Sequence, residues 1–288
     1  MEKNSSRSIF VAFIANLGFA VVELLFGTLF NSSAIVADSV HDLGDALAIG
    51  LSYYFERFSK RESDGNYTLG YLRFSLLGAM LTSVILIVGS LFVLIENVSK
   101  LLDPQPINYN GMFFLGIVAV VVNVLASRVL DGTHSEQESI LSLHFLEDTL
   151  GWLAIIGVSV ILRFTDWYFL DPLLSLIIAV FILYKALPKF ISNLQIFLEK
   201  RPASLAIEPL KREMLTIDGL KSINQLNVWS IDGRRHIAMV HIECEKSADR
   251  DLVRDQIHHI FQAHNIIESA IECDRSSFEH HHHCIHKF

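Results

Sequence analysis

The sequence predicts a membrane α-helical protein in which six transmembrane helices precede a small cytosolic α+β domain. The first observation is the composition. Of the 288 residues, 51% are hydrophobic, and the mean hydropathy of +0.41 is high for a soluble protein of this size. The second is distribution, because the apolar residues form long runs before about residue 197. The third is that the remainder shows the helical and alternating patterns that are typical of soluble domains.

Six apolar runs each approach the roughly 20 residues that a bilayer requires. They lie at residues 8–30, 33–56, 73–97, 110–130, 142–163 and 168–190. Lys100 and Arg163 fall on one side of the predicted membrane, and the other flanking basic residues fall on the opposite side. The positive-inside rule then places both termini in the cytosol. The first run is too long for the core of a cleavable signal peptide. Without a targeting segment or long insertions, a bacterial inner membrane is favoured.

The remainder of the chain is predicted to be a small open α+β sandwich. Composition places a transmembrane domain at 1–197, a cytosolic domain at 198–275 and a His-rich tail at 276–288. The cytosolic elements follow the order αββαβ, with helices at 207–215 and 249–264 and strands at 223–231, 236–245 and 267–273. Asp232 and Gly233 are typical of a two-residue hairpin turn, and Ser247 is a candidate cap for the second helix.

Two of the predicted spans carry the same pattern of ionisable residues. His41 and Asp45 lie four apart in the second span, and His144 and Asp148 lie four apart in the fifth. Residues i and i+4 share one face of an α-helix, so two such helices bring two imidazoles and two carboxylates to one point. That ligand set suits a tetrahedral divalent metal, zinc above all. Since ionisable residues inside a membrane are costly and usually functional, we predict a metal site there.

Structural roles are the alternative for these and other polar residues. The four paired residues could instead form a buried polar network that stabilises the helix bundle. Ligand orientation, helix packing or contact with water is expected for Asp38, Asp42 and Glu147. Hydrogen bonds between helices are expected for Asn16, Glu23 and Asn123. Asp171, ahead of Pro172, is expected to cap its own helix. A solvated surface position is expected for His236, His259 and His264.

The paired motifs resemble those of the cation diffusion facilitators, the zinc-transporter group of proton-coupled heavy-metal exporters. Ala37–Asp45 (ADSVHDLGD) matches the motif of the second helix in that family, and Leu143–Gly151 (LHFLEDTLG) matches that of the fifth. The resemblance covers almost the full chain. Shorter supporting matches are Asn16, Glu23 and Gly27, Gly70–Arg73, Asn123, Asp171–Pro172, and Val228–Ile231.

The resemblance implies a homodimeric membrane transporter with a metallochaperone-like cytosolic domain. It also implies alternating access around a site formed by His41, Asp45, His144 and Asp148. Members with His at the first of these positions favour zinc and often cadmium, with cobalt and iron as further candidate substrates and protons as the counter-ion. Membrane lipid and divalent metal ions are the expected partners, and nucleic acid is not.

Departures from the family pattern concern two further metal sites. Where some relatives hold a metal between spans two and three, this chain has Asp64, Tyr67 and Tyr71, so we predict no metal there. The Glu that usually follows the Gly-Tyr-x-Arg run is replaced by Ser75. In the cytosolic domain, Asn224 and Asn227 occupy two positions that are often His. The candidate ligands that remain there are His241, Glu272 and Asp274, with His258 as a possible bridge.

The ligand chemistry predicts antiport rather than catalysis. A metal-binding His must be neutral and an Asp ionised, so metal and protons compete for one site. No GxxxxGK[ST] run is present, in agreement with transport that needs no ATP. A membrane metalloenzyme is one alternative, but the chain lacks HExxH and four protein ligands would fill the position that catalytic zinc keeps open. A membrane metal sensor is the other alternative.

The sulfur and histidine groups near the C-terminus have separate expectations. The three cysteines are Cys244, Cys273 and Cys284, and an odd number in a cytosolic region argues against a disulfide framework. The run His280–His283 is expected to gather metal near the cytosolic mouth without taking part in the transport cycle.

Overall fold

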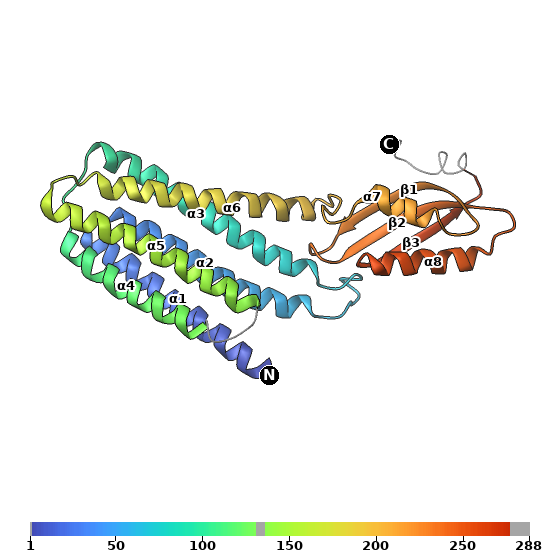
Figure 1. Cartoon of the computed structure of the whole chain (residues 1–288), viewed down its shortest axis with the longest axis horizontal. Coiled ribbons are helices and arrows are strands. Elements are labelled where there is room, and N and C mark those ends of the chain that lie inside the picture. The colour runs from blue at the N-terminus through green and yellow to red at the C-terminus, as the bar shows by residue number, and fades with distance from the viewer. Residues whose placement is uncertain (1, 131–135, 277–288) are drawn as a thin grey trace. The chain divides into compact units, whose positions relative to one another are not determined.

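Six long helices lead into a small sheet unit (Figure 1). The computed structural model of the chain describes residues 2–130 and 136–276, and it describes side chains from Ile14 onward except at 15, 52, 56, 126–130 and 136–147. The long helices are α1 (Glu2–Phe30), α2 (Ser33–Ser59), α3 (Arg73–Leu102), α4 (Tyr109–Leu130), α5 (Glu136–Phe164) and α6 (Leu170–Phe197). Each overlaps one predicted apolar run, so the prediction of a mostly helical chain is confirmed.

The chain forms two compact units. The first comprises Met1–Tyr54 and Gly78–Phe190, and the second comprises Phe55–Leu77 and Ile191–Phe288. The helices α2, α3 and α6 each run from one unit into the other. The boundary predicted between residues 197 and 198 stays a prediction, as does the separate tail, because residues 277–288 lie outside the described part of the chain.

The core of the first unit holds α5 against its neighbours. Trp152 is fully buried, and its ring meets that of Phe19 edge to face at a centroid separation of 6.2 Å. It belongs to one apolar cluster with Ile35 of α2, Met112 of α4 and Ile155 of α5. Aromatic side chains bury the largest apolar areas in such cores. Because Trp152 lies one turn beyond Asp148, its packing fixes the part of α5 that carries this carboxylate.

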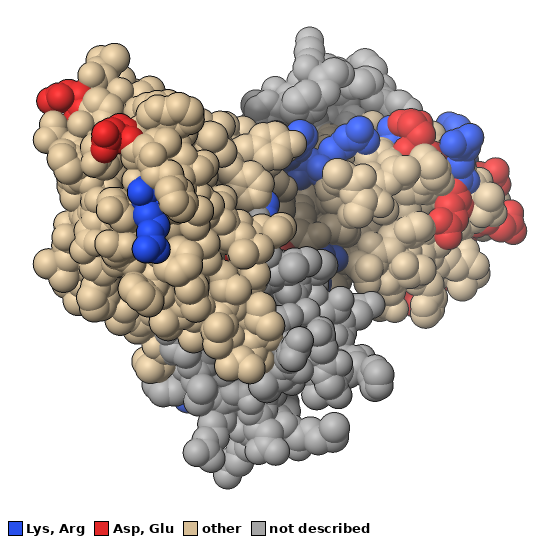
Figure 2. Space-filling view, turned by 60° about the vertical axis from the view of Figure 1, so that its left-hand side comes forward, with Lys and Arg blue, Asp and Glu red and all other residues tan. Residues whose placement is uncertain are grey.

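Much of the helical surface is apolar. Leu29, Ile95, Phe114 and Tyr184 are each exposed over more than two thirds of their surface, and large exposed apolar surface marks contact with a membrane or partner. Figure 2 shows one face, on which uncharged side chains predominate and charged groups are confined to patches. Among the described residues, α3 and α6 meet the length and composition needed to cross a bilayer.

The second unit contains a three-stranded mixed sheet in the order β1-β2-β3. Its elements are α7 (Ile207–Met214), β1 (Leu220–Ser230), β2 (His236–Cys244), α8 (Arg250–Ala263) and β3 (Ile266–Asp274). β2 pairs antiparallel with β1 and parallel with β3. Leu210 and Met214 of α7 join Val240 of β2 and Ile257 and Phe261 of α8 in one buried cluster. The predicted order αββαβ is therefore observed.

Two local predictions in this unit were wrong. Strand pairing ends at Ser230 and His236, so five residues connect the strands instead of the expected two. Asp232 accepts the backbone amides of Arg234 and Arg235, which closes this longer loop. The cap of α8 is Asp249, whose carboxylate accepts the amides of Asp251 and Leu252 at 3.0 and 3.3 Å, and not Ser247. A carboxylate at the N-cap satisfies amides that lack a helical partner.

Candidate metal sites

Side chains from α2 and α5 converge inside the first unit. The Nδ1 atom of His41 lies 3.6 Å from Oδ2 of Asp45, and its Nε2 atom lies 3.9 Å from Oδ1 of Asp148. The side chains of His41 and Asp45 are 17% and 22% exposed, and that of Asp148 is 6% exposed. One imidazole and two carboxylates are thus brought together from two helices. The side chain of His144, the fourth predicted ligand, lies outside the described residues.

Asp171 of α6 anchors the start of the helix that carries His41. Its carboxylate accepts the Ser32 hydroxyl at 2.6 Å and the amides of Ser33 and Ala34 at 2.5 and 3.3 Å. The prediction that Asp171 caps its own helix was therefore wrong, because it caps α2 from a different helix. Since the first amides of a helix have no helical acceptor, this contact fixes the entry of α2 and, two turns later, the position of His41.

Further acidic side chains line the buried faces next to this cluster. Asp38 and Asp42 are each 5% exposed and Glu23 of α1 is fully buried. A Cβ atom at Gly151 of α5 would lie 3.7 Å from Oδ1 of Asp38, so the glycine leaves room for this carboxylate against α5. The polar neighbour of Glu23 is the carboxyl group of Asp42 on α2, with which it makes a side-chain hydrogen bond. The interhelical hydrogen bond expected for Glu23 therefore joins two carboxyl groups.

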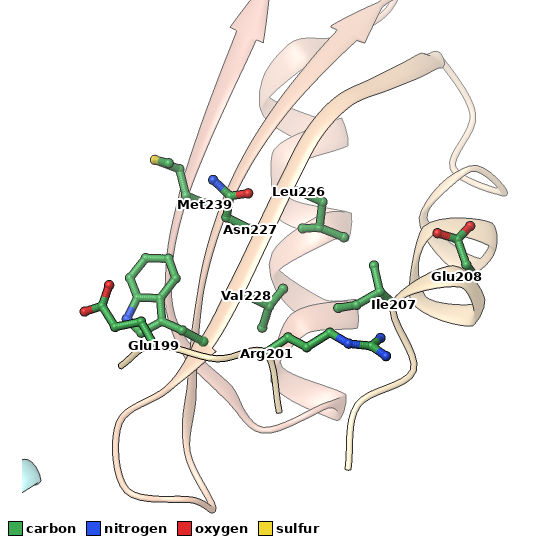
Figure 3. A pocket seen from close by; sticks show the side chains of 9 residues that line it. Glu199, Arg201, Ile207, Glu208, Leu226, Asn227, Val228 and Met239 are labelled. Carbon is green, nitrogen blue, oxygen red and sulfur yellow. The ribbon is translucent and has the colours of Figure 1, made fainter. Parts of the chain in front are cut away.

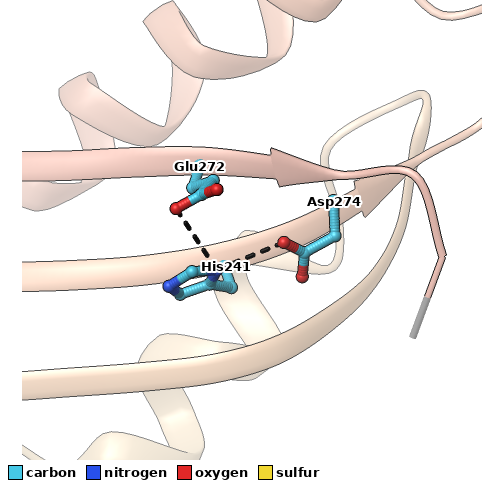
Figure 4. A group of neighbouring side chains, drawn as sticks. All are labelled: His241, Glu272 and Asp274. Carbon is cyan, nitrogen blue, oxygen red and sulfur yellow. Dashed lines mark hydrogen bonds and ion pairs between the residues drawn. The ribbon is translucent and has the colours of Figure 1, made fainter. Parts of the chain in front are cut away.

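A second group of candidate ligands lies on the sheet (Figure 4). The Nδ1 atom of His241 on β2 lies 3.2 Å from Oδ1 of Asp274 and 3.7 Å from Oε2 of Glu272, both on β3. The ligand atoms of the three residues all lie within 4.8 Å of one another. Strand register explains the grouping, because His241 pairs with Glu272 and alternate residues share a face.

The two other residues considered for this group have different roles. Asn224 donates its amide to Oδ2 of Asp274 at 2.8 Å, so it orients a candidate ligand. His258 of α8 instead makes a hydrogen bond between its Nδ1 atom and the hydroxyl of Ser269 at 2.9 Å. Ser269 and Glu272 face opposite sides of β3 by strand alternation, so the structure does not bring His258 to this group within one chain.

The loop between α2 and α3 holds Asp64 by hydrogen bonds. The Tyr71 hydroxyl donates to Oδ2 of Asp64 at 2.5 Å, and the amides of Asn66 and Tyr67 donate to its Oδ1 at 2.8 Å. The hydrogen bond from Tyr71 and those backbone amides lower the pKa of Asp64 from its usual value. The rings of Tyr67 and Tyr71 pack at an interplanar angle of 44° with a centroid separation of 4.5 Å. The prediction that this loop binds no metal stays a prediction. The contacts of Asp64, Tyr67 and Tyr71 hold the loop in its observed conformation.

The three histidines expected at the surface differ from one another. His236 is 4% exposed, so that prediction was wrong for this residue, and burial lowers its pKa from the usual value. His259 is 74% exposed in its side chain and lies 3.6 Å from Asp255. His264 is partly exposed and its Nε2 atom contacts Glu213 at 2.8 Å. His236 is the first residue of β2, the central strand of the sheet, and the strands on both sides bury it although it is polar.

The second unit also contains a pocket (Figure 3). It is lined by residues of the segment before α7, of α7 itself and of the first two strands, which are Glu199, Arg201, Ile207, Glu208, Leu226, Asn227, Val228, Trp229 and Met239. None of the candidate metal ligands lines it. No local sequence pattern predicts this pocket, because only tertiary folding brings together the segments that form its walls.

Comparison with known proteins identifies related chains. The family model described as the cation efflux transmembrane domain matches residues 9–198. The zinc transporter ZitB of Escherichia coli is 30% identical over 275 residues, covering 93% of this chain and 87% of that protein. ZitB of Pectobacterium atrosepticum is 29% identical, covering 99% and 93%. A cadmium, cobalt and zinc/H(+)-K(+) antiporter of Bacillus subtilis is 24% identical, covering 97% and 92%.

Proposed function

Since the chain belongs to the cation efflux family of membrane transporters, we propose that it is a proton-coupled antiporter that exports divalent transition-metal ions from the cytosol. It is a transporter and not an enzyme. Zinc is the first proposed substrate and cadmium the second, with cobalt and iron as further candidates. The names of the relatives support this choice, since they specify zinc, cadmium and cobalt.

The observation that carries the proposal is the convergence of His41, Asp45 and Asp148 from two helices. With His144, which lies one helical turn before Asp148, they supply two nitrogen and two oxygen ligands. Zinc accepts such a tetrahedral set at about 2.0–2.2 Å from each ligand atom. The separations of 3.6 and 3.9 Å involve different nitrogens of the His41 ring, so one zinc ion would take one of these nitrogens and the two carboxylates would close around it.

Proton coupling follows from the same ligands. Imidazole binds metal only when it is neutral, and carboxylate only when it is ionised. At a neutral cytosolic pH the site takes the metal, and protonation on the more acidic side lowers its affinity and releases it. The site then returns with protons bound, so metal and protons exchange by mutual exclusion. The antiporter named among the relatives supports exchange with protons.

The membrane arrangement proposed here has six spans and cytosolic termini. The helices α1 to α6 contain 22 to 30 residues, and about 20 suffice to cross a bilayer. The charged residues of α2 lower its mean hydropathy, as expected of a span that carries the transported ion. The relatives come from bacteria, which favours the inner membrane. A homodimer embedded in lipid is part of the proposal.

His241, Glu272 and Asp274 are proposed as a cytosolic metal site of lower affinity. Their three ligand atoms are close enough for one ion, but Glu272 is 71% exposed and must be ordered on binding. His258 joins this site only if it comes from the second copy of the dimer. Asn224, which already donates to Asp274, holds this ligand in place without contributing one.

Zinc uptake into proteoliposomes under a pH gradient tests the proposal. The unmodified protein is expected to move zinc, whereas Asp45→Ala and Asp148→Ala should move no more than vesicles without protein. Asp103→Ala removes an exposed carboxylate and should match the parent rate. If the parent protein bound zinc without moving it, the chain would be a metal sensor. Parent-like uptake by both site variants, with intact folding, would refute the proposed site.

A further inference from the structure

Two cysteines meet on the sheet face that the helices cover. Cys244 ends β2 and Cys273 lies near the end of β3, and both are free, partly exposed thiols. Both pack against the buried cluster formed with α7 and α8, and the register of the two strands makes them diagonal neighbours on one face of the sheet. Strand alternation places them on the face opposite to His241, Glu272 and Asp274. They therefore form a pair of thiols separate from that group.

The strand register favours a bridging ion over a disulfide. Cys273 pairs with Ile242, which is two residues from Cys244. Strands about 4.8 Å apart with a rise of about 3.3 Å per residue put such Cα atoms roughly 8 Å apart, whereas disulfides need about 4.4–6.8 Å. A metal ion reaches further, because it separates the two sulfurs by two bonds of about 2.3 Å each.

The surroundings favour a soft ion of single charge. Thiolate sulfur selects soft cations such as copper(I), and two thiolates complete the linear coordination that such ions prefer. The complex of two thiolates with one monovalent cation carries one negative charge. Arg250 and Arg254 of α8 lie within electrostatic reach of Cys244 and stabilise that charge. A zinc ion would need two more ligands, which the described residues around the pair do not supply.

We infer that Cys244 and Cys273 form a binding site for one soft monovalent metal ion, of the copper(I) or silver(I) class, on the helix-covered face of the sheet. Two sulfur–metal bonds form as two S–H bonds break, and both protons leave to solvent. The inference is independent of the site shared by α2 and α5.

Cysteine protection by silver(I) tests the inference in the full-length protein. Silver(I) is the probe because it is monovalent and needs no reductant. The parent for the test carries Cys284→Ser, which removes the thiol outside the described residues. One equivalent of silver(I) should protect both Cys244 and Cys273 from iodoacetamide, as mapped by mass spectrometry, and zinc should not. Cys244→Ser should expose Cys273 to the reagent at the same silver concentration, and Cys273→Ser should expose Cys244.

A control variant on the other face of the sheet shows whether the protection is specific to the two cysteines. His241→Ala should leave the protection unchanged, because His241 faces the opposite side of the sheet. Protection of only one cysteine, or equal protection by zinc, would overturn the inference. It would also be overturned if each single variant kept its remaining thiol fully protected. Rapid formation of a Cys244–Cys273 disulfide with hydrogen peroxide would show that the sulfurs approach more closely than the register allows, which would equally contradict the assignment.

Discussion

At the scale of single residues, His41 is expected to set the metal preference. Its imidazole contacts both Asp45 and Asp148, so it stands at the centre of the observed cluster. Imidazole suits zinc, whereas carboxylate suits manganese. In His41→Asp, zinc should therefore lose affinity relative to manganese, as measured by competition on the purified protein. An unchanged preference would mean that selectivity comes from neighbouring groups such as Asp42.

His236 is expected to make the sheet sensitive to acid. Burial lowers its pKa below the usual value of about 6.5, so the unfolded state binds the proton more readily than the folded state. Stability from this residue is therefore complete above about pH 6.5 and declines as the pH falls below that value. As the pH falls from 7.5 to 5.5, the β2 amides should lose protection, so their hydrogen exchange should slow by less than the base-catalysed intrinsic rate does.

The control for this prediction is the same substitution at an exposed histidine. His236→Gln removes the titrating group and should abolish the pH-dependent part of the exchange, at some cost in overall stability. His259→Gln changes an exposed histidine on α8 and should leave the pH-dependent part of the exchange unchanged. If the two variants showed the same pH dependence as the parent, another group would be responsible for the acid sensitivity.

At the scale of elements, the start of α8 depends on Asp249. Its carboxylate satisfies two amides of the first turn, and the loss of such a cap typically costs about 1 kcal/mol. Asp249→Ala should destabilise the sheet unit by that order, measured by urea denaturation of the full chain followed through a probe on α8. Ser247→Ala should have an effect near zero. The reverse ranking would restore the cap predicted from the sequence.

Helices and strands also show which features of the fold follow from local sequence and which do not. Long apolar runs fix where helices lie, and strand alternation fixes β1 to β3, because both patterns are local. The cap of α2 is not a local feature, because it is supplied by Asp171, which contacts Ser32 across 139 residues of chain. His236 and the pocket at Trp229 fall in the same class. Their surroundings are set by tertiary packing, which one sequence does not display.

The candidate transport site was accessible to sequence reasoning for a physical reason. The spacing of four residues places His41 beside Asp45 on any α-helix, and the repeat in the fifth span indicates a partner helix. What the spacing could not indicate is the buried carboxyl group of Glu23 beside Asp42 or the room that Gly151 leaves for Asp38. These depend on how α1, α2 and α5 pack.

At the scale of the whole molecule, coupled exchange is the central claim, and simultaneous recording of zinc and proton flux tests it most directly. In proteoliposomes with an acidic lumen and a luminal pH dye, zinc uptake should be accompanied by a proportional rise in luminal pH. Asp148→Asn, which keeps the shape of the side chain and removes its charge, should abolish both signals. Zinc uptake that continued at the parent rate without proton movement, or in the Asp148→Asn variant, would contradict the account.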